Sequence, residues 1–514
     1  MSFFKDKKFA ILFVIACSLS TVPVFFNTFA LSLDGPAHLY NSNLIAELLK
    51  GNPVVNDYVS FNKLHLTNWS GHLILTVFNL VAPAWIAQKV FILLLVVSFP
   101  LSFGFMVNRL NYSSRYLSFI IIPFSYSIFF FLGFYNFLLA VIFFFLWLAF
   151  IYKESRVYSA REKVLIFILC LLMECSHVFM FTVAMAIFMV YLALPVIRKN
   201  KFRLFITLRE LLKPLKTFLV LSSGGLLLFL FYYFNKTGQF LEQQDVTVTW
   251  YKIFSDVFTI SPLLCLTEKN SSLTSILFIL IELTVVFLIA REFLTGKYKN
   301  SYFFLYTALL VLCFFVLTMA FFDQGLYIQS RFLFLFFIFL FIWIALQKVP
   351  KLIQIGLIIF SLVVFSLFIN YYKFNLYLLS SRCYAIYDVG QKIDKNARVF
   401  CVNFSDHWLE SHQLNYLGAE NPLILYDNYE CNQNYFPLKW KNQEIVETLW
   451  DDFYKGIYSK TFSENVDYVA ILEEPVKNSD DQTIKSLSMV KNNYTPVLVS
   501  IDKRLTIYKK NPNE

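Results

Sequence analysis

The chain has 514 residues, of which 58% are hydrophobic and only 15% are charged. Soluble domains contain about 45–50% apolar and about 25% charged residues, so this composition excludes a soluble enzyme and a disordered chain. The formal net charge of +10 does not indicate nucleic-acid binding. The basic residues form short clusters between long apolar runs, which is typical of the cytoplasmic loops of membrane proteins. We therefore expect a polytopic membrane protein with no nucleic-acid partner.

A transmembrane helix needs about 20 apolar residues, and the sequence predicts about eleven such helices. They cover residues 9–30, 86–107, 116–131, 134–152, 164–175, 178–197, 217–235, 272–290, 302–321, 332–347 and 352–372. The first follows Lys5, Lys7 and Lys8 and precedes no small-residue cleavage site, so we interpret it as a retained helix rather than a signal peptide. The basic clusters alternate with the spans and place the N-terminus in the cytoplasm and the C-terminus outside.

Two regions leave the helix arrangement open. Between the basic clusters around Lys163 and Arg198, the chain is too short for two full spans. Either two short helices meet in a hairpin near 174–177, or one long tilted helix contains this segment; the basic flanks favour the hairpin. Residues 69–82 are apolar but too short to cross, and we expect them to lie along the membrane surface.

From residue 373 the chain becomes polar. Expected strands cover 398–403, 422–426, 466–472, 496–501 and 505–509, and expected helices cover 382–394, 407–417, 443–454 and 482–490. Alternating strands and helices indicate an α/β domain. We therefore predict a transmembrane module at 1–372, with the first outer loop 32–85 and its interfacial helices, and an extracytoplasmic α/β domain at 373–514.

The first outer loop contains Asp34 directly after the first span. A structural interpretation is available, with Asp34 as helix N-cap, Pro36 in the first turn and Gly51 as C-cap. The functional interpretation is that a carboxylate at the membrane surface is partly desolvated and acts as a general base or as a metal ligand. Asp34 and Asp57 are the candidate metal ligands.

All six histidines fall on the outer side of this topology: His38, His65, His72, His177, His407 and His412. No Cys or His spacing matches a zinc motif, so we expect no structural zinc. Glu174 lies three residues before His177, which places both on one helical face. Arg331 begins a span after an outer loop, where its guanidinium and free helix amides suit a phosphate. Cys401 and Cys431 lie where a disulfide is allowed.

The layout resembles the GT-C superfamily of polytopic glycosyltransferases. The resemblance covers the whole chain: one span, a long outer loop that starts with an acid, a bundle of spans and a terminal outer domain. Its local motifs are Asp34-Gly35-Pro36-Ala37-His38-Leu39, Gly133-Phe134-Tyr135-Asn136-Phe137-Leu138-Leu139 and Arg331. The chain departs from the family because one acid, not two, opens the loop, and because no Pro-Pro pair precedes the second interfacial helix.

The resemblance implies sugar transfer from a polyprenyl-phosphate donor to a glycan, lipid or protein acceptor, at the outer face of the cytoplasmic (inner) membrane. It implies that Asp34 is the catalytic base and that Arg331 binds the phosphate. Residues His38, His72, Glu174 and His177 would assist, and a divalent metal is a candidate cofactor. The alternatives are a lipid-linked sugar transporter or flippase, a non-catalytic assembly protein, and a ligase or polymerase of surface polysaccharide.

The predicted orientation has a direct test. A phosphatase reporter fused after Glu514 should be active, because it would lie outside, whereas one inserted within residues 198–216 should be inactive. An inactive C-terminal fusion, with the fusion protein present at normal levels, would contradict the odd number of spans.

Overall fold

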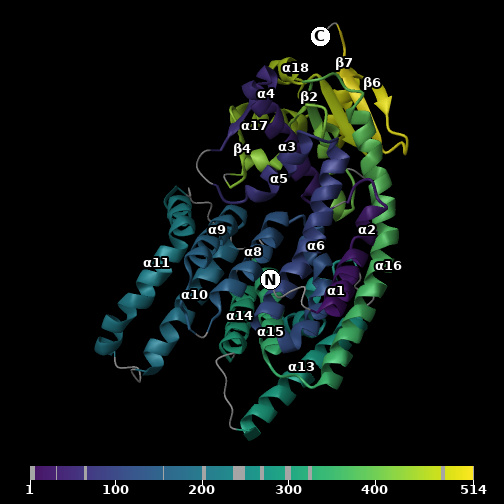
Figure 1. The fold of residues 1–514 in the computed structure, drawn as a ribbon. Coiled ribbons are helices and arrows are strands. Elements are labelled where there is room, and N and C mark those ends of the chain that lie inside the picture. The colour runs from purple at the N-terminus through teal and green to yellow at the C-terminus, as the bar shows by residue number, and fades with distance from the viewer. Residues whose placement is uncertain are drawn as a thin grey trace. The chain divides into compact units, whose positions relative to one another are not determined.

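The computed structural model describes residues 6–30, 32–62, 66–153, 155–199, 204–235, 249–266, 271–295, 302–321, 327–433, 435–475 and 481–512. The chain forms two compact units, and Figure 1 labels many of their elements. We call residues 1–23, 94–130 and 135–373 the helical unit, and residues 24–93, 131–134 and 374–514 the α/β unit. The first outer loop, which we expected to group with the spans, thus packs with the C-terminal residues.

The helical unit is built from apolar helices. Its elements are α1 (Lys7–Leu19), η1 (Tyr112–Tyr126), α7 (Ile128–Phe131), α8 (Tyr135–Ile151), α9 (Ala160–Ser176), α10 (Val178–Lys199), α11 (Leu204–Asn235), α12 (Trp250–Phe258), η2 (Ser261–Leu263), α13 (Ser271–Thr295), α14 (Tyr302–Phe321) and α15 (Ile328–Leu346). Helix α6 (Ala84–Leu110) and α16 (Lys351–Gly390) run from one set of residues into the other.

Eight segments among the described residues are long and apolar enough to cross a membrane. They lie at Ala84–Leu110, Tyr112–Phe131, Val178–Lys199, Glu210–Phe234, Ser271–Thr295, Tyr302–Met319, Ile328–Leu346 and Lys351–Gly390. Three further expected spans are helical but shorter: α1 has 13 residues, and α8 and α9 have 17 each. The chain is therefore an integral membrane protein, with eight full-length candidate spans rather than eleven.

The first expected span, 9–30, is wrong in its length. Helix α1 ends at Leu19, and the short helix α2 (Val22–Phe25) starts after a turn. The hydroxyl of Ser20 donates to the Cys17 carbonyl, and that of Thr21 donates to the Ser18 carbonyl at 2.6 Å. Pro23 has no N–H to continue the ladder of α1 but suits the start of a new helix.

Three other boundaries differ from expectation. Residues 382–394 do not form a separate helix, because α16 runs unbroken for 40 residues to Gly390 with no Gly or Pro near residue 373 to stop it. Residues 112–126, which contain Pro123, form a 3₁₀ helix rather than an α-helix. Residues 407–417 form the 3₁₀ turns η5 (Trp408–Glu410) and η6 (Gln413–Gly418).

The α9–α10 region follows the hairpin interpretation in having two helices. The chain breaks only at His177, whose backbone is extended with φ −161° and ψ 114°. Its N–H still donates to the Met173 carbonyl at 2.8 Å. One extended residue therefore separates the two helices.

The α/β unit begins with α3 (Gly35–Lys50), α4 (Pro53–Tyr58), β1 (Val59–Phe61) and α5 (Ser70–Asn79). Helix α5 has ten residues, or about 15 Å at 1.5 Å per residue, which is too short to cross a membrane. The C-terminal elements are β2 (Arg398–Asn403), β3 (Ile424–Leu425), η7 (Tyr429–Asn432), β4 (Leu438–Trp440), α17 (Gln443–Lys455), α18 (Lys460–Asn465), β5 (Tyr468–Leu472), α19 (Asp481–Asn493), β6 (Tyr494–Val499) and β7 (Leu505–Lys510).

Five strands form the main sheet of this unit in the order β3-β2-β5-β7-β6. Strand β2 is parallel to β3 and β5, whereas β7 is antiparallel to β5 and β6. All five side chains of β5 are buried, as expected for a central strand covered on both faces. The predicted strands are therefore confirmed, and their order shows the α/β arrangement.

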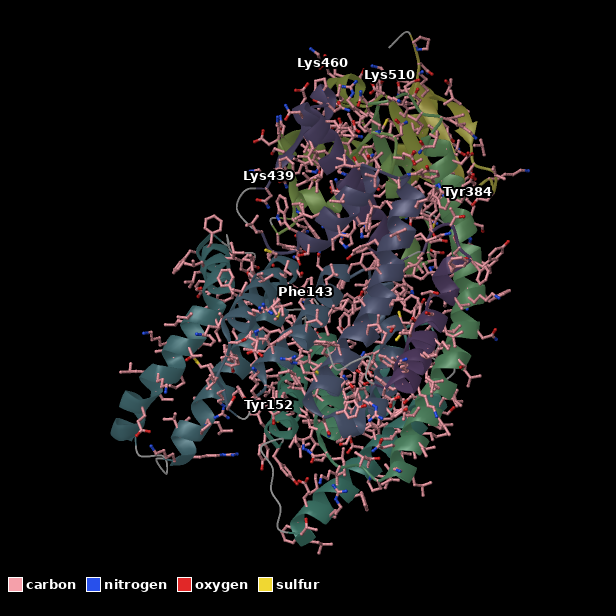
Figure 2. The ribbon with its side chains drawn as sticks, in the orientation of Figure 1. Phe143, Tyr152, Tyr384, Lys439, Lys460 and Lys510 are labelled. Carbon is pink, nitrogen blue, oxygen red and sulfur yellow. The ribbon has the colours of Figure 1, made fainter. Side chains whose placement is uncertain are left out.

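The core of this sheet depends on an amphipathic helix. Helix α17 buries Val446, Leu449 and Phe453, which share one face. The ring of Phe400 on β2 lies 4.6 Å from that of Trp450 and 5.1 Å from that of Phe453. The opposite face of α17 carries exposed acids such as Glu444 and Asp451, and elsewhere in this unit Figure 2 labels the exposed Lys439 and Lys460.

A second, two-stranded sheet joins the first outer loop to the C-terminal residues. Strand β1 pairs antiparallel with β4, with Val59 opposite Trp440 and Phe61 opposite Leu438. The sequence did not predict this pairing, because neither three-residue strand has a distinctive pattern. It fixes the outer loop to the α/β domain over nearly 380 intervening residues.

Two glycines of α16 offer a matched test of the packing. A Cβ at Gly390 would lie 2.2 Å from the Leu417 carbonyl oxygen, whereas one at Gly356 meets nothing within 4 Å. We predict that Gly390→Ala loses about 1–3 kcal/mol of stability through overpacking. Gly356→Ala should stay within about 1 kcal/mol of wild type. Thermal unfolding of the detergent-purified protein measures both, and equal melting temperatures would contradict the close packing.

Candidate functional site

The carboxylate of Asp34 does not act as a helix cap. Asp34 occupies the N-cap position of α3, but among the described residues its side chain makes no capping hydrogen bond. The hydroxyl of Ser32 accepts the Gly35 N–H instead, at 3.2 Å. Pro36 and the left-handed Gly51 do mark the two ends of the helix as expected. The structural interpretation of Asp34 therefore leaves its carboxylate unexplained.

A turn from the second predicted motif holds the backbone of Asp34. The Leu33 N–H donates to the Phe131 carbonyl at 2.8 Å, and the Asp34 N–H donates to the Leu132 carbonyl at 3.2 Å. Gly133 has φ +77°, and a Cβ there would lie 2.9 Å from the Asp34 nitrogen. Only glycine combines that backbone conformation with such a close approach.

The environment of Asp34 makes it a stronger base than an ordinary aspartate. The net effect of its surroundings raises its pKa to about 6: burial and the charge of Glu430 raise the pKa, and His38 and the Tyr429 hydroxyl lower it. The imidazole of His412 lies close, with Nε2 3.7 Å from Asp34 Oδ1. Burial lowers the pKa of His412 to about 4, so this ring is neutral at pH 7. The Asp34 side chain is 13% exposed.

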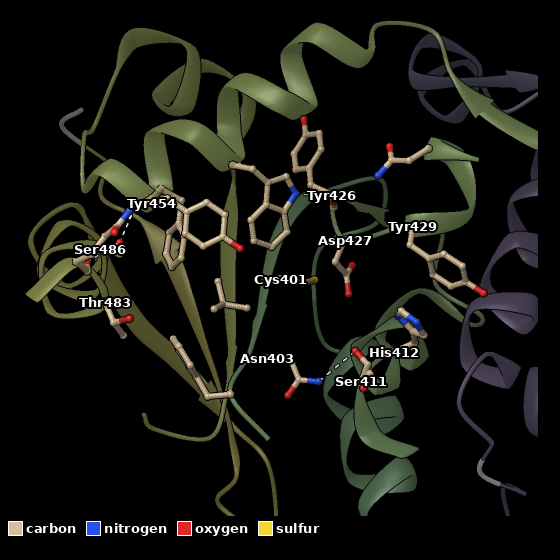
Figure 3. Close-up of a pocket in the computed structure, with 16 residues that line it drawn as sticks. Cys401, Asn403, Ser411, His412, Tyr426, Asp427, Tyr429, Tyr454, Thr483 and Ser486 are labelled. Atoms are coloured by element: carbon tan, nitrogen blue, oxygen red, sulfur yellow. Dashed lines mark hydrogen bonds between the residues drawn. The ribbon is translucent and has the colours of Figure 1, made fainter. Parts of the chain in front are cut away.

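A cavity of about 600 Å³ lies beside these residues in the α/β unit (Figure 3). Its lining includes Cys401, Asn403, Ser411, His412, Tyr426, Asp427, Tyr429, Trp450, Tyr454, Thr483 and Ser486. It lies past the carboxyl ends of the parallel strands β2 and β3, where open α/β sheets commonly bind ligands. The ring of His412 stacks on that of Tyr429 at 4.2 Å, and both rings line the cavity. These two residues therefore connect the cavity with Asp34.

One more acid lies within the cavity wall. Burial raises the pKa of Asp427 to about 7, while its contacts with Cys401 and Asn415 act in the opposite direction. The amide of Asn415 donates to Asp427 Oδ2 at 3.1 Å. The cavity thus combines a protonatable carboxyl, neutral hydrogen-bonding groups and several aromatic faces.

A buried cluster of two histidines and one glutamate lies next to Asp34. The Nδ1 atom of His38 is 2.6 Å from Glu430 Oε1, and Nε2 of His72 is 2.8 Å from Glu430 Oε2. The ligand-type atoms of the three residues lie within 4.8 Å of one another, so they are able to hold a metal ion. Burial alone would raise the pKa of Glu430, but the two imidazoles hold it far below its usual range. Burial lowers the pKa of His38, but Glu430 outweighs this and the net shift is upward.

The other predicted site residues belong to the helical unit. Arg331 lies 5.6 Å from the ring centroid of Phe137 and 5.9 Å from that of Phe179. The ring of His177 lies 5.4 Å from Phe137 and 6.4 Å from Phe179, so the same two phenylalanines contact both residues. Glu174 is 1% exposed, and its Oε2 has no hydrogen-bond partner within the described part of the chain.

The structure thus brings the predicted residues together in two groups. Asp34, His38 and His72 belong to the α/β unit, and Glu174, His177 and Arg331 belong to the helical unit. The convergence of the two groups on one cavity stays a prediction.

The candidate metal ligand Asp57 is exposed on α4 and belongs to no cluster of ligand-type residues that the structure describes. Glu47, the other acid of the first outer loop, pairs with Lys50 and Asn52. Cys401 and Cys431 are free thiols. His65 and residues 322–326 lie outside the described residues.

Sequence reasoning missed Glu430, and it named His412 only as one histidine among six. Glu430 is 392 residues from His38 and 358 from His72, so no motif connects them. The one available signal was the predicted location of all six histidines on the outer side of the membrane, which does not identify their partners.

Fold and site together define a polytopic membrane protein in which the Asp34 carboxylate adjoins a cavity in an α/β unit. No family model and no curated protein sequence matches the chain. Among solved structures, it is similar to ArnT from Cupriavidus metallidurans in the apo state, with 12% identity, 98% of each chain covered and a TM-score of 0.44. The same protein bound to undecaprenyl phosphate gives 12% identity, 98% of each chain and a TM-score of 0.43.

The close contact at Gly133 predicts a specific loss of stability. Gly133→Ala should cost about 1–2 kcal/mol for the left-handed conformation and about 1–3 kcal/mol more for the clash with Asp34. Gly51→Ala is the matched control, because Gly51 has φ +78° but nothing within 4 Å of its Cβ position. Thermal unfolding of both variants compares the two costs, and an equal loss would show that the turn does not support Asp34.

Proposed function

We propose that this chain is a glycosyltransferase of the inner membrane. It moves a sugar from a polyprenyl-phosphate donor to an acceptor on the extracytoplasmic face. The observation that carries the proposal is the Asp34 carboxylate. It follows the first hydrophobic segment, has no capping role among the described residues, and lies beside a cavity large enough for a sugar.

The proposed reaction is a displacement at the anomeric carbon. An acceptor hydroxyl oxygen attacks this carbon, and the bond between the carbon and the phosphate oxygen breaks with its electron pair going to the phosphate. The hydroxyl proton passes to Asp34. A base with a pKa of about 6 is suited to this step, because it is mostly ionised at pH 7 yet binds a proton more strongly than an ordinary aspartate.

Arg331 is our candidate for the phosphate ligand, with His177 and Glu174 as neighbours. A guanidinium stabilises the negative charge that develops on the leaving phosphate. Its contacts with the Phe137 and Phe179 rings give it a fixed place at the start of α15. The isoprenoid chain of the donor would remain in the bilayer between helices.

The cavity of the α/β unit is our candidate for the acceptor site. Flat aromatic faces such as those of Trp450 and Tyr454 suit the apolar faces of sugar rings, and Asn403 and Thr483 offer hydrogen bonds to hydroxyls. Because His412 and Tyr429 line the cavity and approach Asp34, an acceptor bound there would present a hydroxyl toward the base.

A non-catalytic assembly protein is the main competing function. It would use Asp34 only to start α3, which is difficult to reconcile with a carboxylate that makes no capping bond there. A transporter would need a polar route across the membrane, for which the spans offer few charged residues.

Replacement of the base separates these functions. Asp34→Asn should lower sugar transfer about 10²–10⁴-fold, the usual contribution of a general base. It should not lower the melting temperature. Burial of an ionised carboxylate costs folding free energy, and a neutral amide avoids this cost. The assay follows release of polyprenyl phosphate from a panel of synthetic polyprenyl-phosphate hexoses and pentoses, in membranes that supply the acceptor. Asp451→Asn, at an exposed position of α17, is the control.

The pH profile gives the same prediction a second readout. Activity should be full above pH 7 and fall as the pH drops through about 6, because Asp34 is then protonated. His38, His412, Glu430 and Tyr429 face this carboxyl, and burial together with His38, Tyr429 and Glu430 sets its pKa. Retention of full activity at pH 5, or in Asp34→Asn, would eliminate Asp34 as the base.

A further inference from the structure

The cluster of His38, His72 and Glu430 is among the most completely buried groups of ionisable residues in the described chain. The relative exposures of the three residues are 5%, 0% and 0%. Both oxygens of the Glu430 carboxylate are used, one toward each ring. Three ionisable groups are therefore removed from water together, and their charges must be balanced within the cluster.

The ring nitrogens of His38 and His72 that face away from Glu430 show where the protons lie. Nε2 of His38 is 2.9 Å from the Gly133 carbonyl oxygen, and Nδ1 of His72 is 3.2 Å from the Asn68 carbonyl oxygen. A carbonyl oxygen only accepts hydrogen bonds, so each of these nitrogens carries its proton. In a neutral imidazole the other ring nitrogen then has no proton and presents a lone pair. Both lone pairs point at the same carboxylate, Glu430.

A lone pair facing a carboxylate oxygen is repulsive unless a positive charge lies between them. Added protons or a metal ion supply it. In one arrangement both imidazoles take a second proton, and in another, one divalent cation accepts both lone pairs and a carboxylate oxygen. The cation carries the same two charges as the two protons and adds coordination bonds to each ligand.

We propose, contrary to the expectation from histidine spacing in the sequence, that His38, His72 and Glu430 bind a divalent metal ion of the zinc class. Two imidazole nitrogens and one carboxylate oxygen form a ligand set that zinc uses, whereas calcium and magnesium prefer oxygen alone. A metal-ligating histidine usually donates its second N–H to a carbonyl or carboxylate, which is the arrangement of both rings here. Three protein ligands leave a fourth position for water or substrate.

The surroundings are those of a built site. The ring of Phe436 lies 5.9 Å from His38 and 5.8 Å from His72, and covers both imidazoles. The hydroxyl of Ser42 donates to the His38 carbonyl at 2.6 Å and lies 3.2 Å from the His72 carbonyl, so α3 and α5 are held together. The metal would connect these two helices to η7, which carries Glu430.

The present distances between the ligand atoms predict how the site changes when a metal ion binds. Zinc bonds of about 2.0–2.2 Å place tetrahedral ligand atoms about 3.3 Å apart. The present separations of 2.6 and 2.8 Å are those of direct contacts, so the ligands should move apart by about half an ångström when the ion binds.

Metal content is the test. The full chain, purified in detergent without chelators, should contain about one equivalent of zinc by mass spectrometry, as expected for a structural or catalytic site. His72→Ala should lose this equivalent, and His407→Asn should keep it, because His407 lies in the same unit but only caps η5.

A second measurement does not depend on a folded variant. Wild-type protein stripped with a chelator and refilled with cobalt should show the intense visible absorption of tetrahedral Co²⁺, which zinc then abolishes. A folded wild-type protein with no stoichiometric metal and no such absorption would overturn the proposal and leave the doubly protonated cluster. Neither readout involves sugar transfer, so these experiments test the metal site independently of the transferase function.

Discussion

The carboxylate of Glu430, buried between His38 and His72, is the interaction on which the α/β unit depends. It connects residues 24–93 with the C-terminal residues at a point where all three side chains are buried. Removal of one partner from a buried charged pair costs about 3–5 kcal/mol, because the remaining charge has no compensation. The pairing of β1 with β4 and the packing of α3 on α5 hold the same two parts of the chain together.

The position of Asp34 follows from this arrangement. Gly133 accepts a hydrogen bond from His38 through its carbonyl and contacts the backbone of Asp34, so one turn serves both the buried cluster and the candidate base. On the other side, η7 carries both Glu430 and Tyr429, and Tyr429 reaches Asp34 and the cavity. A change in the cluster should therefore alter the pKa of Asp34 and the geometry of the cavity together.

The sequence predicted what local patterns control. Apolar length and basic clusters identified the helical segments, and alternation in the C-terminal part located β2, β5 and β7. The acid at position 34 and the turn at Gly133 were both singled out, because each carries a local signal. Contacts that have no local sequence signal could not be predicted. The partner of His38 is 392 residues away, and β1 and β4 have three residues each, too few to show a pattern. The continuous α16 was missed because a change from apolar to polar residues does not by itself end a helix.

The central claim is that a polyprenyl-phosphate sugar binds with its sugar at Asp34 and its phosphate at Arg331. A cryo-electron microscopy map of the full chain in lipid nanodiscs, with a non-hydrolysable polyprenyl-phosphonate sugar, tests it most directly. The account predicts density for the sugar against Asp34 and for the phosphonate against the Arg331 guanidinium, in one outward-opening cavity. Density for the phosphonate away from Arg331, or a layer of helices between Arg331 and Asp34, would contradict it.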